Sequence, residues 1–194
     1  MSANGDLRSR ILEQARILLL KEGYSAVSMR KIAKAVGCTP TSIYIYFDNK
    51  DALIHALIEE GMEKLHGALG EALQQEPDPR QRFRRICRVF LEFGIQNPEY
   101  YEIMFLLHPD KMERYPSDKY RRARRNLELF AETLSAARGD RSFDAMLSAT
   151  VLWSLLHGAI SLLLAQRLDV GIPAAVFMDQ VVEHASAMLL PKSP

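Results

Sequence analysis

The segment spanning residues 28–50 concentrates side chains that can contact a polar, anionic partner. It contains cationic, hydroxyl, proline and phenol side chains at Arg30, Thr39, Pro40, Thr41, Ser42, Tyr44, Tyr46 and Lys50. Small hydroxyl residues at the start of a helix can approach base edges and thymine methyl groups, whereas tyrosine hydroxyls and lysine ammonium groups suit phosphate oxygens. The chemistry predicted for this segment is therefore contact with a nucleic acid.

Two short helices joined by a tight turn are expected to position these side chains. Ser28 can cap the first helix, Gly37 permits the left-handed backbone that ends it, and the pair Thr39-Pro40 starts the second. Tyr44 and Lys50 are expected to be exposed. Apolar residues recur at helical spacing and are expected to face inward: Met29, Ile32, Ala33, Val36, Ile43 and Phe47. This arrangement is typical of a helix-turn-helix.

Charge supports this interpretation locally rather than globally. The 194 residues include 25 Lys or Arg and 24 Asp or Glu, a net charge of +1. Residues 1–55 hold eight Lys or Arg and five Asp or Glu, an excess of three. Such an excess is compatible with a few phosphate contacts per subunit and with salt-sensitive binding.

The stretch from Ile11 to Gly61 resembles the DNA-binding domain of the tetracycline-repressor (TetR) family. The likeness lies in Gly23-Tyr24, Ile32-Ala33, Val36-Gly37, Ile43-Tyr44-x-Tyr46-Phe47 and Lys50-x-x-Leu53. It implies that the second short helix enters the major groove, with contacts from Arg30, Pro40, Thr41, Ser42, Tyr44, Tyr46 and Lys50. Cys38 departs from the usual pattern; its thiol would sense oxidants if its pKa were lowered, or would be a small buried residue.

Residues 97–105 and 153–158 resemble a TetR-family C-terminal domain that has a Trp and a His-Gly pair, here Trp153 and His157-Gly158. The resemblance implies a homodimer in which residues 143–168 and 173–190 form a four-helix bundle with their mates. Two recognition helices about 34 Å apart would contact a palindromic double-stranded DNA operator. A small-molecule inducer that prefers another subunit arrangement would lower DNA affinity, so the predicted function is a ligand-responsive repressor.

Proline, capping and periodicity signals predict an all-α fold of about nine helices, with no cofactor. The expected helices lie near 6–22, 28–35, 39–46, 49–74, 79–96, 98–107, 117–138, 143–168 and 173–190. Asp78 and Asn97 each precede a proline as expected N-caps, and Asp78 has capping-box spacing to Gln81. We expect a helix-turn-helix domain at 1–55 and a ligand-binding and dimerisation domain at 56–194, with a hinge near 76–79.

The ligand site is expected among aromatic, soft and imidazole side chains of the C-terminal domain. The candidates are Phe90, Phe93, Tyr101, Met104, Phe105, His108, Trp153 and His157. Each of these residues, taken alone, is more typical of an ordinary core. Two arginine clusters, at 80–88 and 121–125, are typical of solvated faces, with an acidic ligand, a partner or DNA phosphate as alternatives.

Other classes of function have less support. An enzyme on a helical scaffold would need a catalytic motif, and no GxSxG, Walker A or GxGxxG sequence occurs. No catalytic residue is assigned, and the histidine and cysteine spacings predict no metal site. The charge-free stretch 145–165 fits a buried or dimer helix better than a membrane span, and a cytoplasmic protein is expected. The remaining alternative is an architectural or interaction protein without an inducer.

Overall fold

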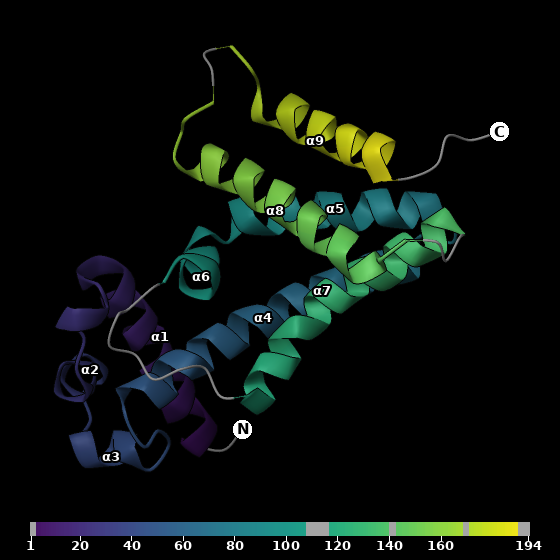
Figure 1. Cartoon of the computed structure of the whole chain (residues 1–194). Coiled ribbons are helices and arrows are strands. Elements are labelled where there is room, and N and C mark those ends of the chain that lie inside the picture. Colours follow the sequence, from purple (N-terminus) through teal and green to yellow (C-terminus); the bar gives the residue numbers. More distant parts are fainter. Residues whose placement is uncertain (1–2, 108–116, 140–142, 169–170, 190–194) are drawn as a thin grey trace. The chain divides into compact units, whose positions relative to one another are not determined.

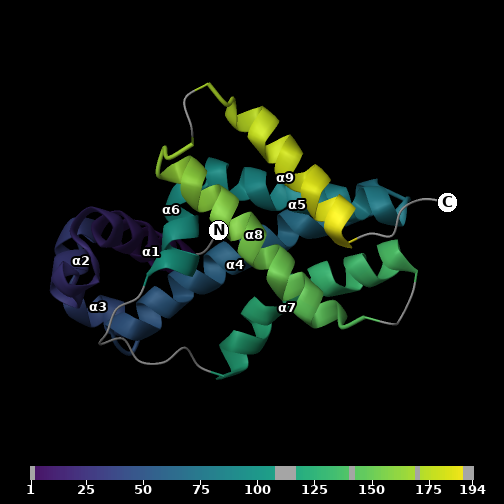
Figure 2. The same ribbon diagram turned by 45° about the horizontal axis from the view of Figure 1, so that its top comes forward.

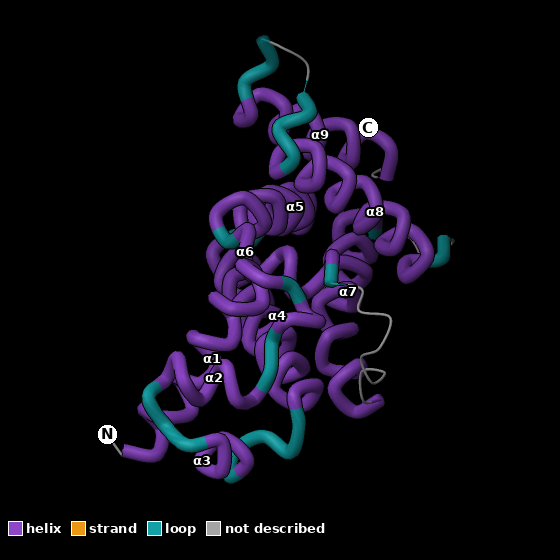
Figure 3. Tube along the Cα trace, turned by 90° about the vertical axis from the view of Figure 1, so that its left-hand side faces the viewer, coloured by secondary structure: helices purple, strands orange, loops and turns teal. Residues whose placement is uncertain are grey.

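The computed structural model describes residues 3–107, 117–139, 143–168 and 171–189, with side chains described except at 3–5 and 117–123. All regular structure in these ranges is helical, which confirms the predicted all-α class (Figure 3). The elements are α1 (Ala3–Glu22), η1 (Tyr24–Ala26), α2 (Met29–Val36), α3 (Pro40–Tyr44), α4 (Lys50–Gln75), α5 (Pro79–Gln96), α6 (Pro98–Tyr101), η2 (Glu102–Leu106), α7 (Ser117–Arg138), α8 (Ala145–Leu164) and α9 (Ala174–Leu189).

Most helix starts follow the predicted caps. The side chains of Thr39 and Asp78 accept hydrogen bonds from the backbone N–H groups of the residues three positions later, at 3.2 and 2.8 Å. Asn97 differs from its prediction, because its side-chain amide donates to the carbonyl of Phe93 and so completes the end of α5. The capping box predicts that the Gln81 side chain accepts a hydrogen bond from the Asp78 N–H. In the structure the Glu76 carboxylate accepts it instead, at 3.1 Å.

The segment 98–107 is not the single α-helix that the sequence predicts. The α-helical turn α6 passes into η2, whose five residues have π-helical hydrogen bonding. A π turn is rare and depends on packing around it, so apolar periodicity does not reveal it.

The chain divides into two compact units. The first comprises residues 1–61 and 99–117, and the second comprises residues 62–98 and 118–194. Helix α4 contributes its first turns to the first unit and its remainder to the second. These two units are defined by contacts between residues. The predicted boundary between the DNA-binding domain and the C-terminal domain, at residue 55, concerns function and stays a prediction.

In the first unit, α1, α2 and α3 gather around the first turns of α4 (Figure 1). The core contains Ile11 and Ala15 of α1, Ile32 of α2, Ile43 of α3 and Leu53 of α4, all fully buried. Helices of eight and five residues are too short to be stable alone. The packing of these side chains must therefore supply the stability of α2 and α3.

The α6–η2 segment packs within this first unit. Arg16 of α1 forms an ion pair with Glu99, and its guanidinium lies 5.3 Å from the ring centre of Tyr100. The Tyr100 hydroxyl donates to Glu60 of α4 at 2.6 Å. Met104 packs against Gly61 so closely that a Cβ at this glycine would overlap the methionine sulfur. These contacts connect α6 and η2 to both α1 and α4.

In the second unit, α8 and α9 lie across α5 (Figure 2). The crossing of α5 and α8 is close at Gly94, where an added Cβ would lie 2.7 Å from the Ile160 Cδ1 atom and 2.8 Å from its Cγ2 atom. The fully buried Asn126 of α7 donates to the carbonyl of Met62 at 3.1 Å and lies 2.9 Å from His66 Nδ1. This polar contact fixes α7 against the second half of α4.

Substitution of Gly94 by alanine should lower the free energy of unfolding by about 1 kcal/mol. Overlap with Ile160 costs roughly 1–3 kcal/mol, which exceeds the gain of about 1 kcal/mol in helix propensity. Gly67→Ala is a matched control because the space around Gly67 is open, and it should raise stability by roughly 0.5–1 kcal/mol. Urea denaturation at one protein concentration compares the variants. Unchanged or greater stability of Gly94→Ala would contradict the close crossing.

Candidate nucleic-acid interface

The turn between α2 and α3 has the geometry of a helix-turn-helix. The Ser28 hydroxyl caps α2 by accepting from the Lys31 N–H at 3.3 Å. Gly37 ends this helix in the left-handed conformation, at φ 77° and ψ 36°. The N–H groups of Gly37 and Cys38 both donate to the carbonyl of Ala33 at 3.0 Å. Since α3 begins three residues after Gly37, its direction is set by this turn.

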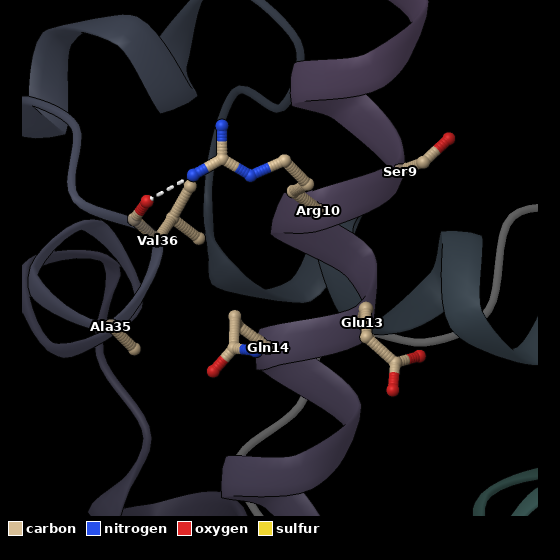
Figure 4. Close-up of a pocket in the computed structure, with 6 residues that line it drawn as sticks. All are labelled: Ser9, Arg10, Glu13, Gln14, Ala35 and Val36. Atoms are coloured by element: carbon tan, nitrogen blue, oxygen red, sulfur yellow. Dashed lines mark hydrogen bonds between the residues drawn. The ribbon is translucent and has the colours of Figure 1, made fainter.

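Arg10 of α1 strengthens the end of α2. Its guanidinium donates to the backbone carbonyl of Val36 at 2.6 Å, as the dashed line in Figure 4 shows. This carbonyl belongs to the last turn of α2, where no helical N–H is left to satisfy it. A cleft of about 300 Å³ lies beside this contact, and its lining comes from Ser9, Arg10, Glu13, Gln14, Ala35 and Val36.

The predicted contact residues around α3 divide into an exposed group and a half-buried group. The exposed members are Arg30, Thr39, Pro40, Thr41 and Tyr44, and the half-buried members are Ser42, Tyr46 and Lys50. The Tyr44 side chain is 52% exposed, as the sequence predicts.

Two of these hydroxyls are hydrogen-bonded to each other. The oxygens of Thr39 and Ser42 lie 2.9 Å apart, and either one can be the donor. Only one proton serves this bond, so the other hydroxyl keeps its proton for an outside acceptor.

Lys50 differs from its predicted exposure. Its ammonium group lies 3.6 Å from the ring centre of Tyr24 and donates to the backbone carbonyl of that residue at 3.1 Å. The Tyr24 hydroxyl in turn donates to Asp51. Lys50 therefore joins the start of α4 to η1, and its removal would affect the fold as well as any phosphate contact.

Ile45 is a surface residue that the sequence prediction missed. Its side chain is 74% exposed, directly after the last residue of α3. The available signal was helical spacing: Ile45 stands two residues from the buried Ile43 and two from the buried Phe47, which places it on the opposite side.

An aromatic cluster occupies the second unit. The Phe90 ring centre lies 4.6 Å from that of Trp153 and 5.2 Å from that of His157. Phe130 of α7, which the sequence prediction did not include, lies 5.8 Å from Phe90 and 5.2 Å from Trp153. Phe90 and Phe130 are buried, whereas Trp153 and His157 are half-buried.

The other predicted ligand residues are placed differently. Tyr101 and Phe105 contact each other in the first unit, with ring centres 5.3 Å apart and ring planes tilted by 56°, and Met104 packs on Gly61 there. Phe93 is buried in the second unit, and His108 lies outside the described residues. Within the second unit, the structure thus brings together three of the predicted residues: Phe90, Trp153 and His157.

Burial lowers the pKa of His157 from 6.5 to about 4, so its imidazole is neutral near pH 7. Burial also raises the pKa of the Cys87 thiol, which disfavours its nucleophilic thiolate form. Cys38 is half-buried in the turn between α2 and α3.

Arginines of α5 pair with carboxylates of α9. Arg84 forms an ion pair with Glu183, and Arg88 forms ion pairs with Asp179 and Glu92. A hydrogen bond from Arg84 lowers the pKa of Glu183. These two arginines of the first cluster thus form ion pairs within the chain. In the second cluster, the side chains of Arg121 and Arg122 lie outside the part of the chain whose side chains the structure describes.

The neutral state of His157 makes the stability of the protein depend on pH. Its folded-state pKa of about 4 lies below the unfolded value of 6.5, so its contribution is complete above pH 6.5 and is lost as the pH falls toward 4. The slope from one such proton is at most about 1.4 kcal/mol per pH unit. We expect His157→Gln to flatten the curve of unfolding free energy against pH in this window. Parallel curves for wild type and variant would contradict a neutral, partly desolvated imidazole.

Two family models match this chain. The model of bacterial regulatory proteins of the tetR family matches residues 11–57, and the model of the tetracyclin repressor-like C-terminal domain matches residues 83–188. Together they include the helix-turn-helix and the helices of the aromatic cluster.

Individual proteins are similar to different extents. The nucleoid occlusion factor SlmA of Vibrio vulnificus is 31% identical over 104 residues, 53% of each chain. The chain thus spans about half the length of this curated relative. The uncharacterized HTH-type transcriptional regulator YobS of Bacillus subtilis is 25% identical over 155 residues, 79% of this chain and 77% of YobS.

Solved structures share the fold over almost the whole chain. A protein of unknown function from a Rhodococcus species has a TM-score of 0.77 at 26% identity, covering 94% of this chain and 93% of that one. The TetR-family regulator PfmR of Thermus thermophilus has a TM-score of 0.68 at 23% identity, covering 93% and 97%. These likenesses show the fold, and the two family models show that the chain belongs to the tetR family of bacterial regulatory proteins.

Proposed function

We propose that this protein is a ligand-responsive repressor that binds a palindromic operator as a homodimer. Its family consists of regulatory proteins, which agrees with the expectation of a regulator rather than an enzyme. The observation that carries the proposal is the α2–turn–α3 unit, whose second helix keeps its apolar side buried and its uncharged polar side exposed. Such a surface suits the major groove, where base edges offer donors, acceptors and thymine methyl groups.

The proposed DNA contacts are those predicted from the sequence. For Lys50, however, the phosphate contact comes in addition to a contact within the protein. Tyr44, Thr41 and Arg30 are exposed and have side chains suited to phosphates or base edges. Lys50 already contacts Tyr24, so one of its three N–H donors is used within the protein. Its proposed phosphate contact depends on the remaining donors.

The proposed dimer surface is the outer face of α8 and α9, within the predicted segments 143–168 and 173–190. Large apolar side chains are exposed along it: Leu147 at 61%, Val151 at 52%, Leu155 at 38% and Leu162 at 43% on α8, and Val176 at 51% and Met188 at 69% on α9. The α8 members recur at spacings of four and seven residues, and so follow one face of the helix. A continuous exposed apolar face of this kind is typical of a protein–protein interface.

The polar groups on this face do not oppose burial. The hydroxyls of Thr150 and Ser154 donate to carbonyls one turn earlier in α8, at 2.8 and 3.0 Å. Because these bonds stay intact when the face is covered, dimerisation would cost little in lost hydration. An apolar groove of about 200 Å³ between α8 and α9, lined partly by Val151 and Met188, can accept a side chain from a second copy.

Helix α8 is also long and apolar enough to cross a membrane by length and composition. We favour a dimer surface over a membrane span because α8 packs against α5 and α9. The family of this protein also consists of DNA-binding regulators. A cytoplasmic location without a membrane follows from the proposed operator, with double-stranded DNA as the partner.

The proposed effector is an uncharged molecule with apolar or aromatic surface. Phe90, Trp153 and His157 offer stacking faces and a neutral imidazole that can exchange one hydrogen bond. We assign this region to the Trp/His-Gly type of TetR C-terminal domain, on Trp153, His157 and Gly158 within the matched range 83–188. The domain boundaries proposed for function remain 1–55 and 56–194.

A second candidate function is DNA binding without an effector, for an architectural or interaction role. The similarity to proteins named nucleoid occlusion factor favours keeping this alternative. The two functions differ in whether a small molecule releases the DNA.

Selection of bound fragments from random duplex DNA tests the proposed function. We expect enrichment of a palindrome with half-sites about one helical turn apart, bound more weakly as salt increases. Tyr44→Ala should lower the affinity for that operator by roughly ten-fold, a loss of about 1.4 kcal/mol, while its unfolding free energy stays within about 0.5 kcal/mol of wild type. In contrast, Ile43→Asp should prevent folding because it buries a charge. Failure of wild type to enrich any sequence would contradict the proposal.

Val151→Glu tests the dimer surface. A carboxylate from each subunit would be buried in the interface, so the dimer dissociation constant should rise at least about 100-fold, or roughly 3 kcal/mol. The monomer should stay folded because Val151 is exposed within one subunit. Sedimentation velocity measures the association. Leu106→Glu, at a residue that is 50% exposed on η2, is the control and should leave it unchanged.

A further inference from the structure

Ile45 has an exposure that folding does not explain. At 74%, it is the most exposed of the large apolar side chains among the described residues. Its backbone stays in the right-handed helical region, at φ −66° and ψ −27°, so the turn of α3 continues through it. The N–H groups of Tyr46 and Phe47 donate to the carbonyl of Ile43 at 2.9 and 3.0 Å. Both bonds span Ile45 and therefore fix its position.

The face of α3 that carries Ile45 also carries Thr41. The two residues are four apart, so their side chains lie on the same side of a helix. Ile43 is fully buried and Phe47 is 5% exposed, and each is two residues away, about 200° around the axis. The outer face of the recognition segment thus presents two methyl-bearing, β-branched side chains.

The chemistry of Ile45 limits what it can recognise. It has no donor or acceptor, so it cannot distinguish base edges by hydrogen bonding. In the major groove, the apolar group that distinguishes one base from the others is the C5-methyl of thymine. A β-branched side chain is also stiff, so little rotamer freedom is lost when it makes that contact.

The surroundings of Ile45 favour DNA over a protein partner. Its neighbours Tyr44, Tyr46, Asp48 and Asn49 are polar, whereas apolar patches that bind proteins extend over several hundred Å². No charged residue occurs from Thr39 to Phe47, so no charge is desolvated when this face meets a base. We propose that Ile45 contacts a thymine methyl group in each half-site and makes the protein select thymine there; this rests on the proposed DNA-binding function.

The experiment uses the full-length protein and the operator obtained by selection. Each thymine of the half-site is replaced in turn by uracil, which removes only the C5-methyl group. Loss of one buried methyl group should weaken wild-type binding about four-fold at one thymine per half-site. Ile45→Ala should bind the unmodified operator more weakly and should show no difference between thymine and uracil at that position. Its response to the other thymines should equal that of wild type.

Ile17→Ala is the matched control, because Ile17 is a 43% exposed isoleucine on α1. It should reproduce the wild-type response to every thymine, and thermal unfolding checks that both variants are folded. If Ile45→Ala keeps the wild-type response at every position, or if no thymine is sensitive although wild-type binding is sequence-specific, the role of Ile45 is overturned. If wild type selects no sequence, the proposed function fails as well. The two failures are thus distinguishable.

Discussion

The left-handed turn at Gly37 is the constraint on which the candidate DNA interface depends. Because the carbonyl of Ala33 accepts two N–H groups there, α2 stops at a defined residue and α3 starts in a defined direction. Neither helix is long enough to hold this direction alone. The buried side chains of Ile32 and Ile43 do so by packing into the first unit, and Arg10 satisfies the last turn of α2. Packing of the inner surface of α3 therefore sets the position of its outer surface.

The second unit distributes its polar and apolar groups differently. Arg84 and Arg88 connect α5 to the acidic side of α9, so ion pairs supplement apolar packing on that side. Exposed ion pairs of this kind contribute little stability singly. The outer face of α8 has large apolar side chains and hydroxyls bonded to their own helix. The same unit therefore has ion pairs across the contact of α5 with α9 and an exposed apolar face on α8.

The parts of this architecture that the sequence predicts correctly depend on signals between residues close together in the chain. The caps at Thr39 and Asp78 and the glycine turn act over three or four residues, and the structure has them where expected. Features that depend on distant residues were not predictable in this way. The pairing of Lys50 with Tyr24 joins residues 26 apart, and Phe130 enters the aromatic cluster from another helix. The π turn η2 likewise depends on its packing, so periodicity alone predicts an ordinary helix there.

The alternation of buried and exposed residues along α3 has an evolutionary consequence. Ile43 and Phe47 contribute to folding, whereas Thr41 and Ile45 contribute almost nothing to the core. Mutations on the outer side are therefore nearly neutral for stability. A duplicated gene could drift toward a new operator through those positions while its product stays folded at every step. The fold thus separates the residues that folding requires from those that a change of operator can alter.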